Sequence, residues 1–190
     1  MAGRVARRPW RGHSNSTGFL RRHAVTMLIV VLLAVGAVSF YVAYNNYSST
    51  LADLPELSTI GYSQVLVDAS LDSNGDGVVT LTSGCTQIRT HVEAAQAESI
   101  YNGMNGIMPA RPNAHDIAAD AFQSLGIQVL MVKVTDMRNQ TFYGRMVLRD
   151  GDRVASLDAR PSDATAIAVR MQVPVYVRTQ LLEENGEKIC

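Results

Sequence analysis

An unbroken apolar run near the N-terminus limits what this 190-residue chain can fold into more than any other feature. Residues 24–44 contain no charged side chain. As a helix rising about 1.5 Å per residue, they would span roughly 30 Å, the thickness of the hydrocarbon layer of a membrane. The sequence therefore predicts one transmembrane helix. A cleaved signal peptide is the alternative, but its apolar run is typically about 7 to 15 residues, and no Ala-x-Ala site ends this one.

The charges on either side of this run predict its orientation. Six arginines and no acidic residue precede residue 24, and no further Lys or Arg occurs before Arg89. Positive charge is retained on the cytoplasmic side of membranes, so residues 1–23 are predicted to be a basic cytoplasmic tail. We therefore expect a single-pass membrane protein whose remaining chain lies outside the cytoplasm.

Beyond the apolar run, we expect a polar linker at 45–57, one globular domain at 58–182 and a flexible tail at 183–190. Short β-branched runs between clusters of turn-forming residues predict strands, and runs of helix formers ended by Gly predict helices. The fold class expected is α+β, with a mixed, largely antiparallel sheet and about three helices. The strands are predicted at 63–70, 77–82, 86–91, 127–134, 141–148, 154–157 and 174–177, and the helices at 92–102, 113–125 and 161–170.

In the second predicted helix, Asn113 is a candidate N-cap. Ile117, Ala121, Phe122 and Leu125 are spaced to form one apolar face that would pack on the core.

Charge and cysteine content restrict the functional classes. With the six N-terminal arginines set aside, 11 basic residues stand against 17 acidic ones, a net charge of −6 for the domain. Nucleic-acid-binding proteins usually carry the opposite sign, which counts against a nuclease. Cys85 and Cys190 fit no metal-ligand spacing. We expect two unrelated thiols rather than a disulfide, although an oxidising compartment would allow one.

Residues 72–77 match the first half of a calcium-binding loop. Asp72, Asn74 and Asp76 alternate ahead of Gly77, as oxygen ligands do in such loops. The twelfth position, which should supply a bidentate Glu, is Ser83, and strands rather than helices are predicted on either side. A hairpin turn is therefore favoured over a calcium site.

Two Arg-Pro pairs each precede a polar helix start. Residues 111–116 bring Arg111, His115 and Asp116 together at one helix, where they could bind an anion or transfer protons. The alternative is a capping cluster. At the other helix, two carboxylates, Asp158 and Asp163, lie beside Arg160 and Ser162. They could hold a divalent cation that activates water at a phosphodiester, or they could belong to a structural Arg–Asp pair.

The run LDARPSDATAIAVRMQVPVYV, residues 157–177, resembles the signature of the bifunctional nuclease family. Arg-Pro-x-x-His-Asp at 111–116 and Thr-Phe-Tyr at 141–143 are similar to that family's upstream pattern in the same order, so the resemblance covers roughly residues 63–182. It implies a compact α+β domain that often associates with itself, with nuclease activity on RNA and DNA in plant members. The membrane anchor and the acidic domain depart from the common family form.

Carried over residue by residue, the resemblance implies a membrane-tethered domain that hydrolyses phosphodiester bonds of RNA or DNA. A divalent metal such as Mg²⁺ is the cofactor this chemistry would use, and the membrane, nucleic acid and further copies of the chain are the expected partners. The alternative is a non-catalytic extracytoplasmic binding or scaffold module of the same fold. The catalytic candidates are Asp158, Asp163, His115 and Asp116, and the substrate-binding candidates are Arg111, Arg160, Ser162 and Arg170.

Overall fold

A computed structural model describes residues 16–52 and 54–190, with the side chains of residues 23–44 and 54–190. The chain divides into two compact units, Met1–Ala52 and Asp53–Cys190. The described part of the first unit is the helix α1 (Ser16–Ala52), which extends beyond the predicted 24–44 at both ends. Its segment His23–Tyr44 has a mean hydropathy of 2.6, and its side chains are exposed. The segment is therefore long and apolar enough to cross a membrane. The first half of the predicted linker is thus helical.

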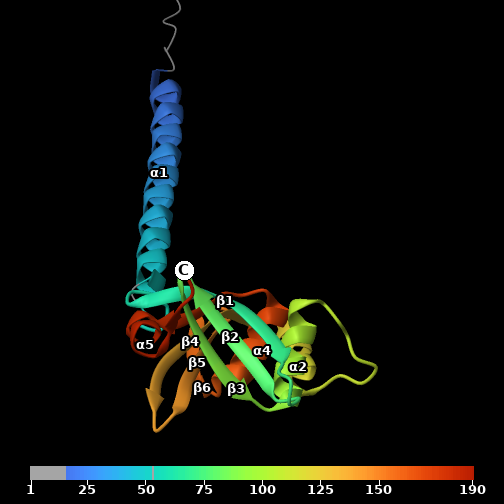
Figure 1. Ribbon diagram of the computed structural model, residues 1–190. Helices are drawn as coiled ribbons and strands as arrows, with labels where there is room; N and C mark the ends of the chain where they lie inside the picture. The colour runs from blue at the N-terminus through green and yellow to red at the C-terminus, as the bar shows by residue number, and fades with distance from the viewer. Residues whose placement is uncertain (1–15, 53) are drawn as a thin grey trace, which may run out of the picture. The chain divides into compact units, whose positions relative to one another are not determined.

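The second unit is built on one eight-stranded sheet in the order β6-β5-β4-β7-β1-β2-β3-β8. Figure 1 labels the strands β1 to β6 of this sheet. Within this described sheet β7 runs parallel to β4, and every other neighbouring pair is antiparallel. The α+β prediction with a mixed, mostly antiparallel sheet is confirmed. The strands are β1 (Tyr62–Leu71), β2 (Gly77–Ser83), β3 (Thr86–Val92), β4 (Gln128–Arg138), β5 (Thr141–Asp150), β6 (Arg153–Ala159), β7 (Val175–Arg178) and β8 (Glu187–Lys188).

Four helices accompany the sheet, one more than expected: α2 (Ala94–Met104), α3 (Ala114–Ser124), α4 (Pro161–Met171) and α5 (Thr179–Asn185). The helix α4 packs on α2, α3, β4 and β5, and its residues from Ala164 to Ala168 are all buried. The small side chains of Ala164, Ala166 and Ala168 let the helix axis approach its neighbours closely. The helix α4 therefore holds α2 and α3 against the core face of the sheet.

The predicted apolar face of α3 is only partly used. Phe122 packs against the core, but Ile117 and Leu125 are 60% and 72% exposed, and Ala121 is exposed as well. The helix instead buries the adjacent face, which carries Asp116 and Ala119. The stripe of Ile117, Ala121 and Leu125 is therefore left in solvent.

The second half of the predicted linker is fixed to the domain by Lys133. This lysine of β4 is 5% exposed, and its Nζ donates to the carbonyl oxygens of Glu56 at 2.6 Å and Ser58 at 2.7 Å. The ammonium also lies 5.2 Å from the centre of the Tyr62 ring. Burial lowers the pKa of Lys133. Glu56, predicted as linker, is thus fixed to the folded unit together with Ser58.

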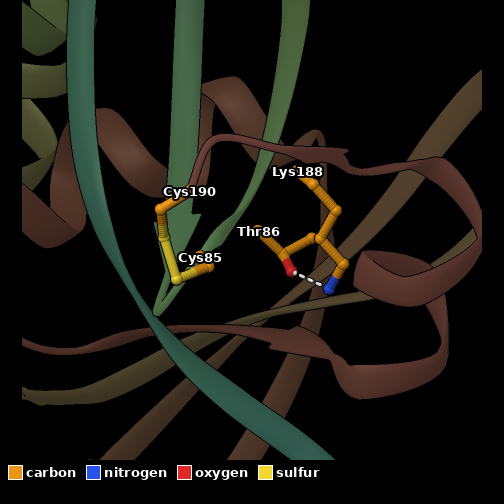
Figure 2. The surroundings of a disulfide bond; sticks show 4 residues. All are labelled: Cys85, Thr86, Lys188 and Cys190. Atoms are coloured by element: carbon orange, nitrogen blue, oxygen red, sulfur yellow. Dashed lines mark hydrogen bonds between the residues drawn. A yellow bond between two sulfur atoms is a disulfide. The ribbon is translucent and has the colours of Figure 1, made fainter.

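The predicted flexible tail is ordered, and the expectation of two unrelated thiols was wrong. Leu181 and Leu182 of α5 are buried in the core, and β8 pairs with β3. Cys85 and Cys190 form a disulfide with a Cα–Cα distance of 5.3 Å. Figure 2 shows this bond beside the hydrogen bond from Lys188 Nζ to Thr86 Oγ1, which measures 2.8 Å. The C-terminal segment is therefore held by apolar burial, strand pairing and a covalent bond.

Candidate functional site

The polar cluster of the domain begins at the N-terminus of α3, where Asn113 is the predicted N-cap. Its Oδ1 accepts from the backbone amides of His115 at 2.8 Å and Asp116 at 3.1 Å. In return, Asp116 Oδ2 accepts from the Asn113 amide at 2.8 Å, which completes a capping box. The capping alternative for residues 111–116 is thus realised, and it fixes the direction of the Asp116 side chain.

Asp116 also forms a buried ion pair with Arg170 of α4. Arg170 Nε lies 2.6 Å from Asp116 Oδ1, and the two side chains are 9% and 4% exposed. Arg170 Nη1 donates to the carbonyl oxygens of Ser99 at 2.9 Å and Ala166 at 2.7 Å. Burial acts to raise the pKa of Asp116, but the Asn113 amide and the Arg170 guanidinium outweigh burial and leave that pKa below its ordinary value. This pair fastens α3 to α4.

Ser99 of α2 joins the buried pair to the imidazole. Its Oγ lies 2.9 Å from His115 Nδ1, 3.0 Å from Asn113 Nδ2 and 3.1 Å from Arg170 Nη2. Ser99 is 3% exposed. A nucleophilic serine must reach substrate, whereas this hydroxyl is enclosed and already bonded to three side chains. The cluster is therefore not a serine-hydrolase site, although it contains Ser, His and Asp.

Asp163 lies at the more exposed edge of the cluster and gathers donors from three side chains. Arg160 Nε donates to Oδ2 at 2.8 Å, while Gln96 Nε2 donates to Oδ1 at 3.1 Å. His115 Nε2 lies 3.3 Å from Oδ1, and the Asp163 side chain is 32% exposed. Partial burial acts to raise the pKa of Asp163, but the neighbouring Arg160 and His115 outweigh that effect and lower it. The two Arg-Pro helix starts, remote in sequence, therefore meet at this carboxylate.

The structure does not bring Asp158 to Asp163. Asp158 is exposed on β6 opposite Arg145 of β5. The adjacent residue Ala159 packs on the core, and a Cβ at Gly144, its β5 partner, would touch Pro161 at the start of α4. Side chains alternate between the faces of a strand, so Asp158 points to the opposite side of the sheet from α4. The expected pairing of these two carboxylates is thus not formed.

Two further candidates lie apart from the carboxylate. Ser162 lines a narrow, almost wholly apolar cavity of about 30 Å³ between β2, β3 and the start of α4. Arg111 is exposed, and within residues 54–190 no hydrogen bond or ion pair joins it to the cluster. Gln96 and Ser99 were missed from the sequence, where residues 92–102 show only helix formers. The sequence offers one weak indication of their role, which is that both lie on the same face of α2 as the buried Ile100.

The carboxylates do not fit a divalent cation. Both oxygens of Asp116 are occupied by Arg170 and the Asn113 amide, and those of Asp163 by Arg160, Gln96 and His115. Among the residues the structure describes, no three His, Cys, Asp or Glu side chains gather in a way that could hold a metal. The cluster therefore offers no set of free ligands for a metal ion that would activate water.

The calcium candidate is a hairpin turn. Asp72 Oδ1 accepts from the backbone amides of Asn74 at 2.8 Å and Asp76 at 3.0 Å. These two amides lower the pKa of Asp72. The carboxylate thus closes the turn between β1 and β2, as the favoured alternative predicted.

Comparison with known proteins shows which family the chain resembles in sequence. The family model described as the bifunctional nuclease domain matches residues 80–189, which include Ser99, His115, Asp163 and Arg170. An uncharacterized protein of Mycobacterium tuberculosis is 32% identical over 115 residues, 60% of this chain and 63% of that protein. This chain therefore spans less than two thirds of that relative's length.

Plant relatives match over a shorter region. Bifunctional nuclease 2 of Arabidopsis thaliana is 33% identical over 89 residues, 45% of this chain and 27% of that protein. Bifunctional nuclease 1 of Oryza sativa subsp. japonica is 30% identical over 89 residues, again 27% of its length. Because the family model covers more than half of the chain and the cluster lies inside the matched region, the chain belongs to the bifunctional nuclease domain family.

Proposed function

We propose that this domain binds and cleaves phosphodiester bonds of RNA or DNA at the edge of the cluster formed by His115, Arg160 and Asp163. The observation that carries the proposal is the 3.3 Å approach of His115 Nε2 to Asp163 Oδ1. It joins an imidazole, a carboxylate and a guanidinium at the ends of two helices. Plant relatives that carry the same domain are called bifunctional nucleases, which supports the proposal.

Each of the three residues has a distinct part in this proposal. The Arg160 side chain is 67% exposed and already forms a fork with a carboxylate, so its guanidinium can bind phosphate oxygens in the same way. His115 supplies an imidazole whose Nε2 lies at the more exposed edge, where it can donate to an oxygen of the phosphodiester. Asp163 orients both groups. Asp116 and Arg170 are too deeply buried to touch a nucleic acid, so their role is to hold α3 and α4 together.

The assay should separate the cluster from the rest of the fold. The full chain in detergent is incubated at low salt with fluorescent single- and double-stranded RNA and DNA, with and without EDTA, because the acidic domain disfavours long polyanions. We expect His115→Gln and Asp163→Asn to reduce cleavage by roughly 100-fold or more. Asp158→Asn is the matched control, since Asp158 lies on the other face of the sheet, and it should leave cleavage unchanged. Equal activity in all three variants would refute the site.

We also propose that the domain lies outside the cytoplasm. The arginines before the apolar helix favour a cytoplasmic N-terminus, and a disulfide persists in oxidising compartments. The measurement is alkylation of thiols in intact cells, followed by a gel-shift assay with and without prior reduction. We expect both cysteines to react only after reduction. Changing the six N-terminal arginines to Glu should produce free thiols, and free thiols in the unaltered chain would contradict the proposed orientation.

The exposed stripe of α3 favours a second candidate, a non-catalytic module that assembles with further copies of itself. Ile117, Ala121 and Leu125 lie on one helix face and carry no charge. Two such stripes packed antiparallel would place Ala121 against Ala121 at the centre and Ile117 against Leu125 on either side, so the surface is self-complementary. Exposed apolar stripes of this kind mark interaction surfaces.

The oligomeric state tests this candidate. Light scattering of the full chain in detergent should give a dimer, and Leu125→Asn should shift it to a monomer. Leu66→Asn is the matched control, because Leu66 on β1 is similarly exposed, at 77% against 72% for Leu125. A monomer in the unaltered chain, or equal effects of the two variants, would rule out assembly through α3.

A further inference from the structure

The hydroxyl of Ser99 has more hydrogen-bonding neighbours than its position on a predicted helix suggested. Three side chains from two other helices and a cap lie within 3.1 Å of its Oγ: His115, Asn113 and Arg170. A serine hydroxyl offers one donor and two acceptor lone pairs. The direction of each of these three bonds can therefore be worked out by elimination.

Two of the three neighbours can only donate. The guanidinium of Arg170 has no acceptor. The amide of Asn113 is fixed in orientation because its Oδ1 already accepts from the backbone amides of His115 and Asp116, which leaves Nδ2 facing Ser99. Both lone pairs of Ser99 Oγ are thus occupied, and its proton has one remaining acceptor, Nδ1 of His115 at 2.9 Å.

We infer that Ser99 is a positioning residue that holds neutral His115 in the tautomer protonated at Nε2. With Nδ1 accepting from Ser99, the ring proton must lie on Nε2, which faces Asp163 Oδ1 at 3.3 Å and the more exposed edge of the cluster. The alternative tautomer would direct an Nδ1 proton at an oxygen that has no free lone pair.

This assignment deepens the proposed function and rests on it for its consequence. At the exposed edge, neutral His115 presents a donor rather than a lone pair. Gln96, Arg160 and His115 then all point N–H groups at the Asp163 carboxylate. A group that competes with Asp163 for these donors must be an oxyanion, and the oxygen of a phosphodiester is of that class. Ser99 therefore sets the polarity of the edge without touching substrate.

The tautomer can be measured without substrate. The full chain is labelled with ¹⁵N-histidine in detergent, and long-range ¹H–¹⁵N correlation spectra separate the two tautomers. His115 is assigned by the loss of its signals in His115→Gln. We expect the pattern of a single tautomer protonated at Nε2. Because the Asp163 carboxylate also favours a proton on Nε2, Asp163→Asn should keep this pattern through Ser99, and the pattern should be lost when Ser99→Ala is added to Asp163→Asn. A wild-type spectrum protonated at Nδ1, or an unchanged pattern in the double variant, would overturn the inference.

A second variant covers the case in which Ser99→Ala fails to fold. Asn113→Ser keeps an N-cap side chain but removes the Nδ2 donor, so it frees one lone pair on Ser99 Oγ. Combined with Asp163→Asn, this change should let His115 populate both tautomers, and a persistent single tautomer in the combined variant would count against the assignment. If the chain cleaves nucleic acid, Ser99→Ala should lower kcat/KM by roughly tenfold. A chain that shows the tautomer pattern but never cleaves would refute the proposed function alone.

Discussion

At the scale of single residues, the cluster separates into a closed part and an open part. Asp116 and Arg170 are enclosed, and every polar atom of that pair is used inside the protein. Arg160 and Asp163 are partly exposed. Since enclosed charges have high desolvation costs and depend on their partners, the two parts should respond differently to substitution.

Asp116→Asn should therefore be far more destabilising than the same change at the surface. It leaves the Arg170 guanidinium enclosed without a counter-charge and weakens the capping box, and loss of one partner of a buried pair costs about 3–5 kcal/mol of unfolding free energy. Urea unfolding of the full chain in detergent, followed by the loss of the domain's circular dichroism signal, measures this loss. Asp158→Asn should change the free energy by about 0.5 kcal/mol or less. Similar losses in the two variants would show that Asp116 is not structural.

The same carboxylates predict loss of stability in acid. The pKa values of Asp116 and Asp163 are lowered in the folded chain, while an unfolded Asp titrates at about 3.9. Their contribution is therefore complete above about pH 4 to 5 and is lost as the pH falls through the folded-state values. Unfolding free energy measured from pH 7 to pH 2 should fall steeply below about pH 4. In Asp116→Asn the slope should be shallower, and an equal slope would assign the acid sensitivity to other groups.

From the sequence, the residues of the cluster could be predicted more easily than which of them lie together in space. Both Arg-Pro helix starts could be predicted, because Pro at the first turn and Asn at the N-cap are local signals. Which side chains share a site depends on strand register instead. Asp158 is one position out of phase with Ala159, so the β6 pairing alone sends it to the other face. Ser99 carries no local signal, since its role exists only where α2, α3 and α4 meet.

At the scale of elements, the contact between α2 and α4 depends on Gly103. A Cβ at this position would lie 2.7 Å from Val169 Cγ2 and 2.8 Å from Arg170 Nη1. The sequence predicts Gly103 as the end of a helix. In the structure it also lets α2 approach α4 closely and leaves room for the buried Arg170 side chain. The helix α2 ends at Met104, just after it.

Gly103→Ala should accordingly destabilise the chain although alanine is the better helix former. The propensity gain is up to about 1 kcal/mol, whereas overpacking typically costs about 1–3 kcal/mol and would displace the Arg170 guanidinium. Thermal unfolding measures the balance. Glu98→Ala, at an exposed position of the same helix, is the control and should be neutral or slightly stabilising. A Tm for Gly103→Ala at or above that of Glu98→Ala would contradict the close contact.

The C-terminal elements show why part of the fold could not be predicted. Residues 183–188 are polar and charged, which is typical of a frayed end. Leu181 and Leu182 were available as signals, but their burial depends on the sheet position of β3, which the sequence does not specify. For α3 the sequence predicted burial that the structure does not show. The spacing of its apolar residues predicts an apolar face, but it does not say whether this chain or another copy covers that face.

At the scale of the whole molecule, the disulfide closes the domain over most of its length. Cys85 and Cys190 are 105 positions apart, and the loop they close contains α2, α3, α4 and the whole polar cluster. The N-terminal unit lies outside this loop. Reduction should therefore affect the stability of the domain while leaving the apolar helix α1 unchanged.

Cys190→Ser should lower the unfolding free energy of the domain by about 4–5 kcal/mol, because a loop of this length restricts the unfolded chain strongly. Denaturant unfolding of the full chain in detergent, with and without dithiothreitol, measures the difference. The double variant with Cys85→Ser should match Cys190→Ser, and neither should respond to the reductant. The α5 and β8 segment should lose protection from hydrogen exchange first, since it is then held by the burial of Leu181 and Leu182, a short strand pairing and the Lys188–Thr86 hydrogen bond. Uniform loss of protection across the domain would show that the bond acts through the unfolded chain alone, as the loop-entropy argument requires, and does not also hold the C-terminal segment in place.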